Sequence, residues 1–182
     1  MWTARPLLDM HLFKNRNFAA GSLIVMVIGV ILFGTTQFVP QLVQEVYGYT
    51  ATDAGLVLTF GGMITIVTMP LAGVLTGRVQ PRVLMGIALP VIAVSLWMMA
   101  HFTVDETFAS IAIARTWQSG AIPFLFVPLM SAAYIGVPPQ RTGNATAIIN
   151  VARNLGGSIG IGMVQALFAR REQFHQERLV SR

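Results

Sequence analysis

Apolar residues fill five long runs between residues 18 and 169, and charged or turn residues separate each run from the next. A helix needs about 20 mostly apolar residues to cross roughly 30 Å of hydrocarbon, since each residue adds about 1.5 Å. None of the five runs contains Asp or Glu. The pattern predicts membrane-spanning helices at about 18–46, 54–76, 83–102, 108–137 and 142–169, the first continuing beyond its apolar run.

The composition supports an all-α membrane fold. Hydrophobic residues make up 54% of the 182 residues and charged residues only 10%, whereas soluble domains carry about 25% charged residues. Cysteine is absent, so the sequence predicts no disulfide. Basic residues lie in short loops between apolar runs and are not gathered on one solvated face, which argues against a nucleic-acid partner.

The charges of the loops predict an orientation. The N-terminal segment and the second and fourth loops together carry six Lys or Arg, whereas the first and third loops carry acids and no Lys or Arg. The positive-inside rule therefore predicts a cytoplasmic N-terminus. With five spans the polar tail at 170–182 would be periplasmic, although its arginines oppose that side. The six basic residues are Arg5, Lys14, Arg16, Arg78, Arg82 and Arg141.

The segment before the first span has two interpretations. Residues 1–17 are predicted to form a cytoplasmic interfacial segment, because apolar and charged residues alternate at roughly helical spacing from Pro6 to Asn17. A frayed linker fits the same pattern equally well.

Polar and aromatic residues mark the first and fourth predicted helices. Gln37 and Gln41 are four residues apart and share a helix face, which lines a substrate path or joins two helices. The fourth helix carries Trp117, Gln118 and Phe124, for which a substrate wall and simple packing both remain open. These five residues are the candidate substrate-cavity set. Arg115, about two turns from the outer end of its helix, is expected to snorkel outward.

The fifth helix carries a second polar face. Asn150, Arg153 and Asn154 are three or four residues apart and fall within the cytoplasmic half of the bilayer, because the uncharged stretch after them is too short to span it. An arginine at that depth must face water, a partner or the bundle interior, so this polar face is a candidate functional site. The alternative is an interfacial first turn with Arg153 reaching lipid phosphates.

Small residues predict two close-packing ridges. One consists of Gly73 and Gly77 in the second helix. The other follows Arg153 in the fifth helix and consists of Gly156, Gly157, Gly160 and Gly162.

The sequence gives no support for an enzymatic function. An intramembrane enzyme would need a nucleophile with its base, or metal ligands, at membrane depth. The chain has three histidines, no cysteine and no acid within the apolar runs. We therefore expect neither an enzyme nor a metal site.

The stretch from Gly73 to Arg82 resembles the loop signature of the major facilitator superfamily, with matches at Gly73, Leu75, Arg78 and Arg82. Gly77 stands where that family usually has Asp. Further stretches resemble the fourteen-span drug:proton antiporters of the EmrB/QacA type. They are residues 6–18, 40–55, 115–120, 138–141 and 150–160.

The resemblance implies that the five spans are helices 7–11 of the twelve-helix core, which is a partial C-terminal half. It implies a bacterial inner (cell) membrane location, small amphipathic substrates and a proton gradient in place of a cofactor. The N-terminal half, where the proton-coupling acids of the family usually lie, and the last helix would be missing partners.

Two functions follow as expectations. The first is a part of a proton-coupled multidrug efflux transporter that works by alternating access and is inactive as this fragment alone. The alternative is a non-transporting membrane module, or a remnant, that associates with a full transporter.

Overall fold

The computed structural model describes residues 10–103 and 106–180, and side chains over residues 12–103 and 106–170. Over these residues the chain forms helices and no strand, which confirms the predicted all-α class with five long helices. In chain order the elements are η1 (Met10–Lys14), α1 (Arg16–Glu45), α2 (Ala51–Thr76), α3 (Pro81–Ala100), α4 (Phe108–Ala133), η2 (Pro139–Arg141) and α5 (Thr142–Val180).

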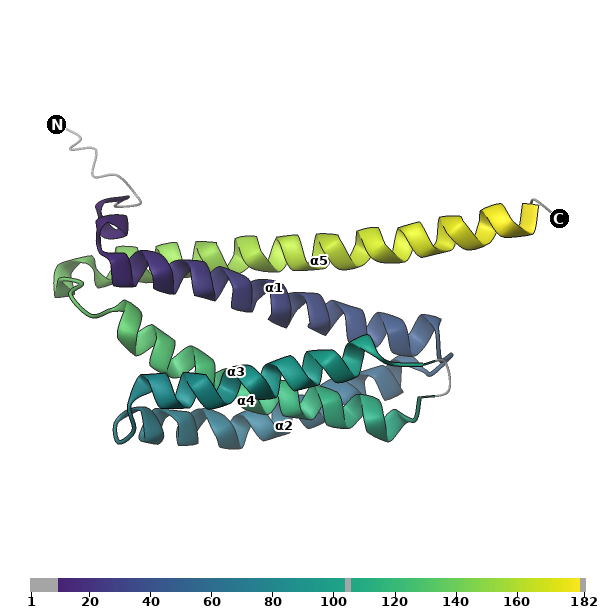
Figure 1. Cartoon of the computed structure of the whole chain (residues 1–182), viewed down its shortest axis with the longest axis horizontal. Helices are drawn as coiled ribbons and strands as arrows, with labels where there is room; N and C mark the ends of the chain where they lie inside the picture. Colours follow the sequence, from purple (N-terminus) through teal and green to yellow (C-terminus); the bar gives the residue numbers. More distant parts are fainter. Residues whose placement is uncertain (1–9, 104–105, 181–182) are drawn as a thin grey trace.

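The five helices form two groups that run side by side (Figure 1). α1 packs along α5, and α4 packs against both α2 and α3. α1 also contacts α2 and α4 and so joins the two groups, whereas α2 and α3 make little contact with each other. A groove lined by residues of α2, α3 and α4 lies between α2 and α3.

Hydrogen bonds tie neighbouring loops together at both ends of the bundle. At one end the Tyr47 hydroxyl donates to the Thr103 carbonyl at 2.5 Å, joining the α1–α2 loop to the α3–α4 loop. At the other end the Asn15 side-chain amide donates to the Ile135 carbonyl at 3.1 Å, joining the start of α1 to the α4–α5 loop. Alternate loops thus lie at the same end, as in a chain that crosses a membrane repeatedly.

Local chemistry explains where two helices begin and end. α2 starts at Ala51, three residues before the expected position, because Thr50 and Asp53 form a reciprocal capping box. α4 ends at Ala133, four residues before the expected position. Gly136 then adopts φ +80°, and Pro138 follows, so the helix cannot continue.

The last helix is longer than its apolar segment. α5 continues to Val180 and projects beyond the other helices (Figure 1). The boundary expected at residue 170 is therefore not a break in the helix. No Gly or Pro occurs after Gly162, and the Arg, Glu and Gln residues that follow are good helix formers. Of the predicted interfacial segment, residues 1–9 lie outside the described part and η1 covers 10–14.

Length and hydropathy select four stretches of the described chain as candidate membrane spans. α4 is not among them, although it has 26 residues, as many as α2, and lies along both α2 and α3. Its mean hydropathy is lowered by polar side chains such as Arg115 and Gln118, which the neighbouring helices bury. The selected stretches are Arg16–Glu45, Ala51–Thr76, Pro81–Ala100 and Pro139–Arg170.

Glycines allow α1 and α5 to approach closely. A Cβ atom at Gly156 would overlap the Met26 carbonyl oxygen, and one at Gly160 would overlap the Val30 carbonyl oxygen. Gly29 likewise faces the Arg153 backbone from the α1 side. The predicted ridge on α5 thus forms a helix–helix contact.

Two other predicted ridge positions make no such contact within the described chain. A Cβ atom added at Gly162 of α5 or at Gly73 of α2 would meet no neighbouring atom within 4 Å. The ridge expected around Gly73 is therefore unused by these residues, and its surface is exposed.

Candidate functional site

Arg115 lies inside the bundle, and the expectation that it snorkels outward is wrong. Its side chain is only 5% exposed. Nη1 donates to the Thr35 hydroxyl oxygen at 2.9 Å, and Nη2 donates to the Thr36 hydroxyl oxygen at 2.7 Å. The guanidinium group therefore bridges from α4 to α1, because both threonines lie on α1 and face it.

Hydrogen bonds within α1 leave the two threonine hydroxyls free to act as acceptors. Thr35 donates its hydroxyl proton to the Ile31 carbonyl at 2.7 Å, and Thr36 donates to the Leu32 carbonyl at 2.6 Å. Each hydroxyl has one proton and two lone pairs. Once the proton is used within α1, only lone pairs remain to face Arg115, which suits a donor-only guanidinium.

Gln118 completes the cluster. It is fully buried, and its Oε1 accepts from Arg115 Nη1 at 2.6 Å across one helical turn. Arg115 Nε and Gln118 Nε2 are buried donors without a partner among the described residues. We call Thr35, Thr36, Arg115 and Gln118 the Arg115 cluster.

The positive charge of this cluster has only neutral partners in the described part of the chain. The acids described between residues 12 and 170 are Glu45, Asp53 and Glu106, which lie at helix ends or in loops. An arginine at membrane depth costs at least a few kcal/mol unless polar groups or water compensate it. Three neutral oxygens supply that compensation here, and two buried donor groups remain without a partner among the described residues.

The sequence marked Gln118 as a candidate site residue, but it predicted that Arg115 snorkels outward. The spacing of Arg115 and Gln118 by three residues was the available signal for a shared face. That α1 would supply the acceptors could not be read from α4 alone, because the pairing spans 80 residues of sequence.

The structure divides the candidate substrate-cavity residues between different surfaces. Gln118 faces α1 within the Arg115 cluster, whereas Trp117 and Phe124 face the opposite side of α4, toward α2 and α3. Gln37 is exposed near the far end of α1. Gln41 donates to Glu45 at 2.9 Å and accepts from Gln165 of α5 at 3.3 Å.

Only two of the three residues of the predicted polar face of α5 contact each other. Arg153 Nη2 donates to Asn150 Oδ1 at 3.0 Å, and both side chains are half-buried. Arg153 Nε is buried and has no partner among the described residues. Asn154 is exposed and lies outside this pair.

The loop-signature residues lie around the α2–α3 turn. Gly73, Gly77, Arg78 and Arg82 are all exposed. The Arg78 amide donates to the Leu75 carbonyl at 3.0 Å, which holds Arg78 one turn beyond Leu75. Arg82 lines a small hollow between α1, α3 and α4.

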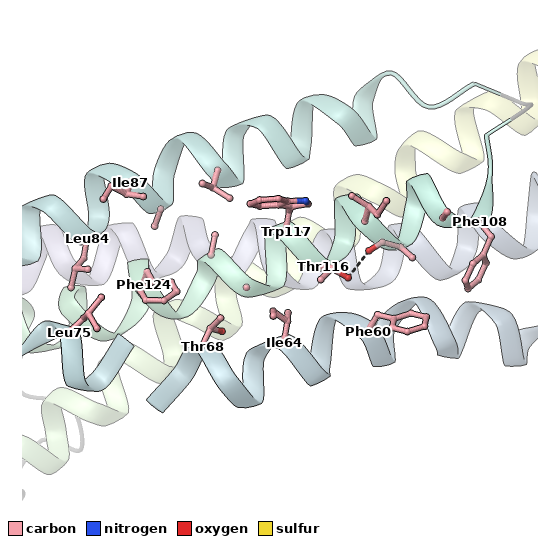
Figure 2. Close-up of a pocket in the computed structure, with 17 residues that line it drawn as sticks. Phe60, Ile64, Thr68, Leu75, Leu84, Ile87, Phe108, Thr116, Trp117 and Phe124 are labelled. Atoms are coloured by element: carbon pink, nitrogen blue, oxygen red, sulfur yellow. Dashed lines mark hydrogen bonds between the residues drawn. The ribbon is translucent and has the colours of Figure 1, made fainter. Parts of the chain in front are cut away.

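A groove of about 840 Å³ lies between α2, α3 and α4. Figure 2 shows its residues: Phe60, Ile64 and Thr68 from α2, Leu84 and Ile87 from α3, and Trp117 and Phe124 from α4. No lining residue is charged. The groove therefore suits an apolar occupant, whereas the Arg115 cluster on the other face of α4 suits an acceptor or anion.

Metal chemistry has no visible site in the described residues. They contain no group of three or more His, Cys, Asp or Glu side chains that could hold a metal ion. That the protein needs no cofactor stays a prediction.

Comparison with known proteins gives the family. Residues 3–161 match the sequence profile of the Major Facilitator Superfamily. The chain is 34% identical to the multidrug export protein EmrB of Escherichia coli (strain K12) over 175 residues, which is 96% of this chain and 34% of that protein. It is 31% identical to EmrB of Haemophilus influenzae over 96% of this chain and 34% of that protein.

The probable multidrug resistance protein EmrY of Escherichia coli is 31% identical over 97% of this chain and 35% of its own length. The chain thus spans about a third of the length of the curated relatives it matches. None of these three names is that of an enzyme. Its apolar helices and bacterial relatives indicate a multi-pass inner-membrane protein. On the sequence match and the five-helix fold, the chain belongs to the Major Facilitator Superfamily.

Proposed function

We propose that this chain forms part of the second half of a multidrug efflux transporter that exports small amphipathic compounds in exchange for protons by alternating access. Relatives named as multidrug export proteins support the substrate class. The acids of the described helices lie near helix ends and not at membrane depth, so the proton-binding group would belong to another part of the transporter. A polypeptide limited to residues 1–182 is then expected to be inactive by itself.

The observation that carries the proposal is the Arg115 cluster. It places a permanent positive charge between α1 and α4, and only neutral oxygens accept its hydrogen bonds in the described chain. By the family resemblance these helices correspond to 7 and 10, which line the central cavity. Arg115 Nε and Gln118 Nε2 are buried and without a partner among the described residues. A helix movement that exposes them would let them donate to an acceptor group of a substrate or to an acid from the other half.

The remaining candidate residues are assigned to three surfaces. Gln37 and Gln41 would contact polar groups of a substrate near one end of α1, while Trp117 and Phe124 would offer apolar and aromatic area on the groove face of α4. Asn150, Arg153 and Asn154 would face the other half of the transporter or a water-filled cavity.

A chimera tests the proposal. Residues 1–182 would replace the matching third of Escherichia coli EmrB, and an efflux-deficient strain would report drug resistance and its loss when the proton gradient is dissipated. We expect resistance from the chimera, none from residues 1–182 expressed alone, and loss of resistance with Arg115→Ala. Membrane levels of all three proteins, measured by immunoblot, serve as the control.

Three results would count against the proposal. Resistance from residues 1–182 alone would contradict the expected inactivity. Full resistance of the Arg115→Ala chimera would remove the Arg115 cluster from the mechanism. A chimera that reaches the membrane at normal levels without conferring resistance would favour the non-transporting module.

A further inference from the structure

The groove between α2, α3 and α4 lies on the opposite face of α4 from the Arg115 cluster. Of the candidate substrate residues, Trp117 and Phe124 line it. Its floor is formed by the α4 positions that face away from α1, such as Ala112, Thr116 and Gly120. Arg115 and Gln118 point to the opposite side of the same helix. The groove is therefore a separate surface from the Arg115 cluster, and its own lining determines what it can bind.

We propose that this groove binds one acyl chain of an anionic phospholipid, with the headgroup phosphate at Arg78. The lining residues are uncharged, and the polar side chains among them are Thr68, Thr116 and the Trp117 indole. Thr116 donates its hydroxyl to the Ala112 carbonyl at 2.7 Å, so it offers no proton to the groove. Such a surface gains most from covering by hydrocarbon.

The dimensions of the groove fit a chain that enters from one leaflet. Along α4 the groove extends from Phe108 to Phe124, which is about 24 Å at 1.5 Å per residue. One leaflet supplies about half of the roughly 30 Å hydrocarbon core. A single acyl chain would therefore fill the half between the α2–α3 turn and Trp117.

The positive charge of Arg78, beside one end of the groove, favours a lipid with an anionic headgroup. Leu75 and Leu84 line the end next to the α2–α3 turn (Figure 2). Arg78 is exposed and lies one turn beyond Leu75, since its amide donates to the Leu75 carbonyl. The turn from Gly77 to Pro81 contains no acid that would compete for this guanidinium. Arginine at the membrane surface attracts anionic lipid.

Arg82 provides a matched comparison within the same turn. It carries the same charge and is also exposed, but it lines the small hollow beside α1 together with Met85. Leu84, Ile87 and Ala88, on another face of α3, line the groove. A phosphate held above the groove should therefore depend on Arg78 more than on Arg82.

Photolabelling in lipid nanodiscs tests the site. The full chain would be placed in phosphatidylcholine nanodiscs with trace phosphatidylglycerol carrying a diazirine in one acyl chain, and labelled peptides would be mapped by mass spectrometry. We expect labels on groove residues of α2, α3 and α4, with competition by unlabelled phosphatidylglycerol stronger than by phosphatidylcholine. Arg78→Gln should reduce that preference about fivefold, and Arg82→Gln should leave most of it.

A second pair of variants tests the acyl chain alone. Ile87→Trp adds bulk at an exposed position that lines the groove, and Leu89→Trp adds the same bulk two residues further along α3, outside the groove. Both side chains are largely exposed, so folding should tolerate either change, and circular dichroism checks this. Ile87→Trp should halve groove labelling or reduce it further, while Leu89→Trp should not alter it.

Several outcomes would overturn the proposal. Even labelling around the bundle would indicate ordinary solvation by lipid. Groove labelling that ignores both headgroup and Arg78→Gln would remove the anionic selectivity. Displacement of the label by tetraphenylphosphonium, but not by phospholipid, would assign the groove to a lipophilic substrate.

Discussion

At the scale of single residues, the placement of Arg115 decides how α1 and α4 are joined. A lysine at this position would keep the charge but lose the planar fork that reaches Thr35 and Thr36 with separate nitrogens. A surface arginine would contribute little to stability, whereas this one is buried and has three acceptors. Its substitution should therefore affect folding as well as transport.

The link from Arg115 to α1 can be measured by a double-mutant cycle. Thr36→Val removes one acceptor and should lower the free energy of unfolding by about 1 kcal/mol, the scale of polar contacts between membrane helices. In an Arg115→Met background the same change should cost much less, because the partner is gone. Detergent unfolding followed by circular dichroism provides the measurement.

Thr59→Val is the matched control for this cycle. Thr59 is exposed, and among the described residues its hydroxyl bonds the Gly55 carbonyl of its own helix and nothing else. Thr59→Val should lower the free energy of unfolding by the same amount with and without Arg115. Equal costs of Thr36→Val in both backgrounds would show that the bridge contributes nothing to folding.

Tyr47 lies in the α1–α2 loop, outside the membrane-spanning segments, and it links the stability of the fold to pH. Burial raises the pKa of its hydroxyl above the ordinary 10.0, and the charges of Glu106 and Tyr49 raise it further. The protonated hydroxyl, which donates to Thr103, is therefore favoured by the folded state. Its contribution is complete below pH 10 and is lost as pH rises through the higher folded pKa.

Tyr47→Phe tests this dependence. Unfolding of the parent chain should show an additional loss of stability as pH rises above about 10, and the Phe variant should lack that loss. Tyr134→Phe is a suitable comparison, because Tyr134 bonds the Thr146 side chain at the other end of the bundle. An unchanged pH profile for Tyr47→Phe would contradict the argument.

At the scale of helices, small residues determine which pairs approach closely. Gly156 and Gly160 place the backbone of α5 against carbonyl oxygens of α1. These contacts leave no room for a methyl group, so the helices would have to separate to accept one. The close approach of α1 and α5 thus depends on residues that have no side chain.

A pair of glycine substitutions should change stability in opposite directions. Gly156→Ala introduces a clash with the Met26 carbonyl and should lower the free energy of unfolding by about 2 kcal/mol. Gly162→Ala, on the same helix, meets nothing within 4 Å and should raise it by up to about 1 kcal/mol through helix propensity. Thermal unfolding of both variants, compared with the parent, gives the signs. A stabilising Gly156→Ala would refute the close contact.

The helices themselves could be predicted from sequence, because long apolar runs without acids have few alternatives. The positions of the helix ends were harder to predict, since the capping box at Thr50 and the glycine at 136 act through backbone geometry. The candidate site was harder still. Trp117 and Gln118 are adjacent in sequence, but a helix turns by about 100° per residue, and they face different neighbours. Periodicity alone does not say which neighbour each face meets.

At the scale of the whole molecule, the bundle has two distinct ends. The start of α1, the α2–α3 turn and the α4–α5 loop share one end, and the other two loops share the opposite end (Figure 1). The first end carries Lys14, Arg16, Arg78, Arg82 and Arg141. We therefore propose that this end is cytoplasmic, which would direct the end of α5 to the periplasm.

Single cysteines can report the orientation, because the chain has none of its own. A membrane-impermeant maleimide added to spheroplasts should label a cysteine at Thr52 but not one at Gln140, both of which are exposed in loops or at helix starts. Inside-out vesicles should give the reverse. The reverse result in spheroplasts would invert the proposed topology.

The buried guanidinium of Arg115 should also make the bundle respond to voltage. An arginine stays charged at any physiological pH, and moving one charge across the full membrane potential involves about 2.3 kcal/mol per 100 mV. Any rearrangement that shifts α4 along the bilayer normal therefore performs electrical work. In a working transporter built on this half, the rate of the conformational cycle should vary with a potassium diffusion potential imposed on proteoliposomes, even at constant pH on both sides. A rate independent of that potential would mean that Arg115 stays at constant depth throughout the cycle.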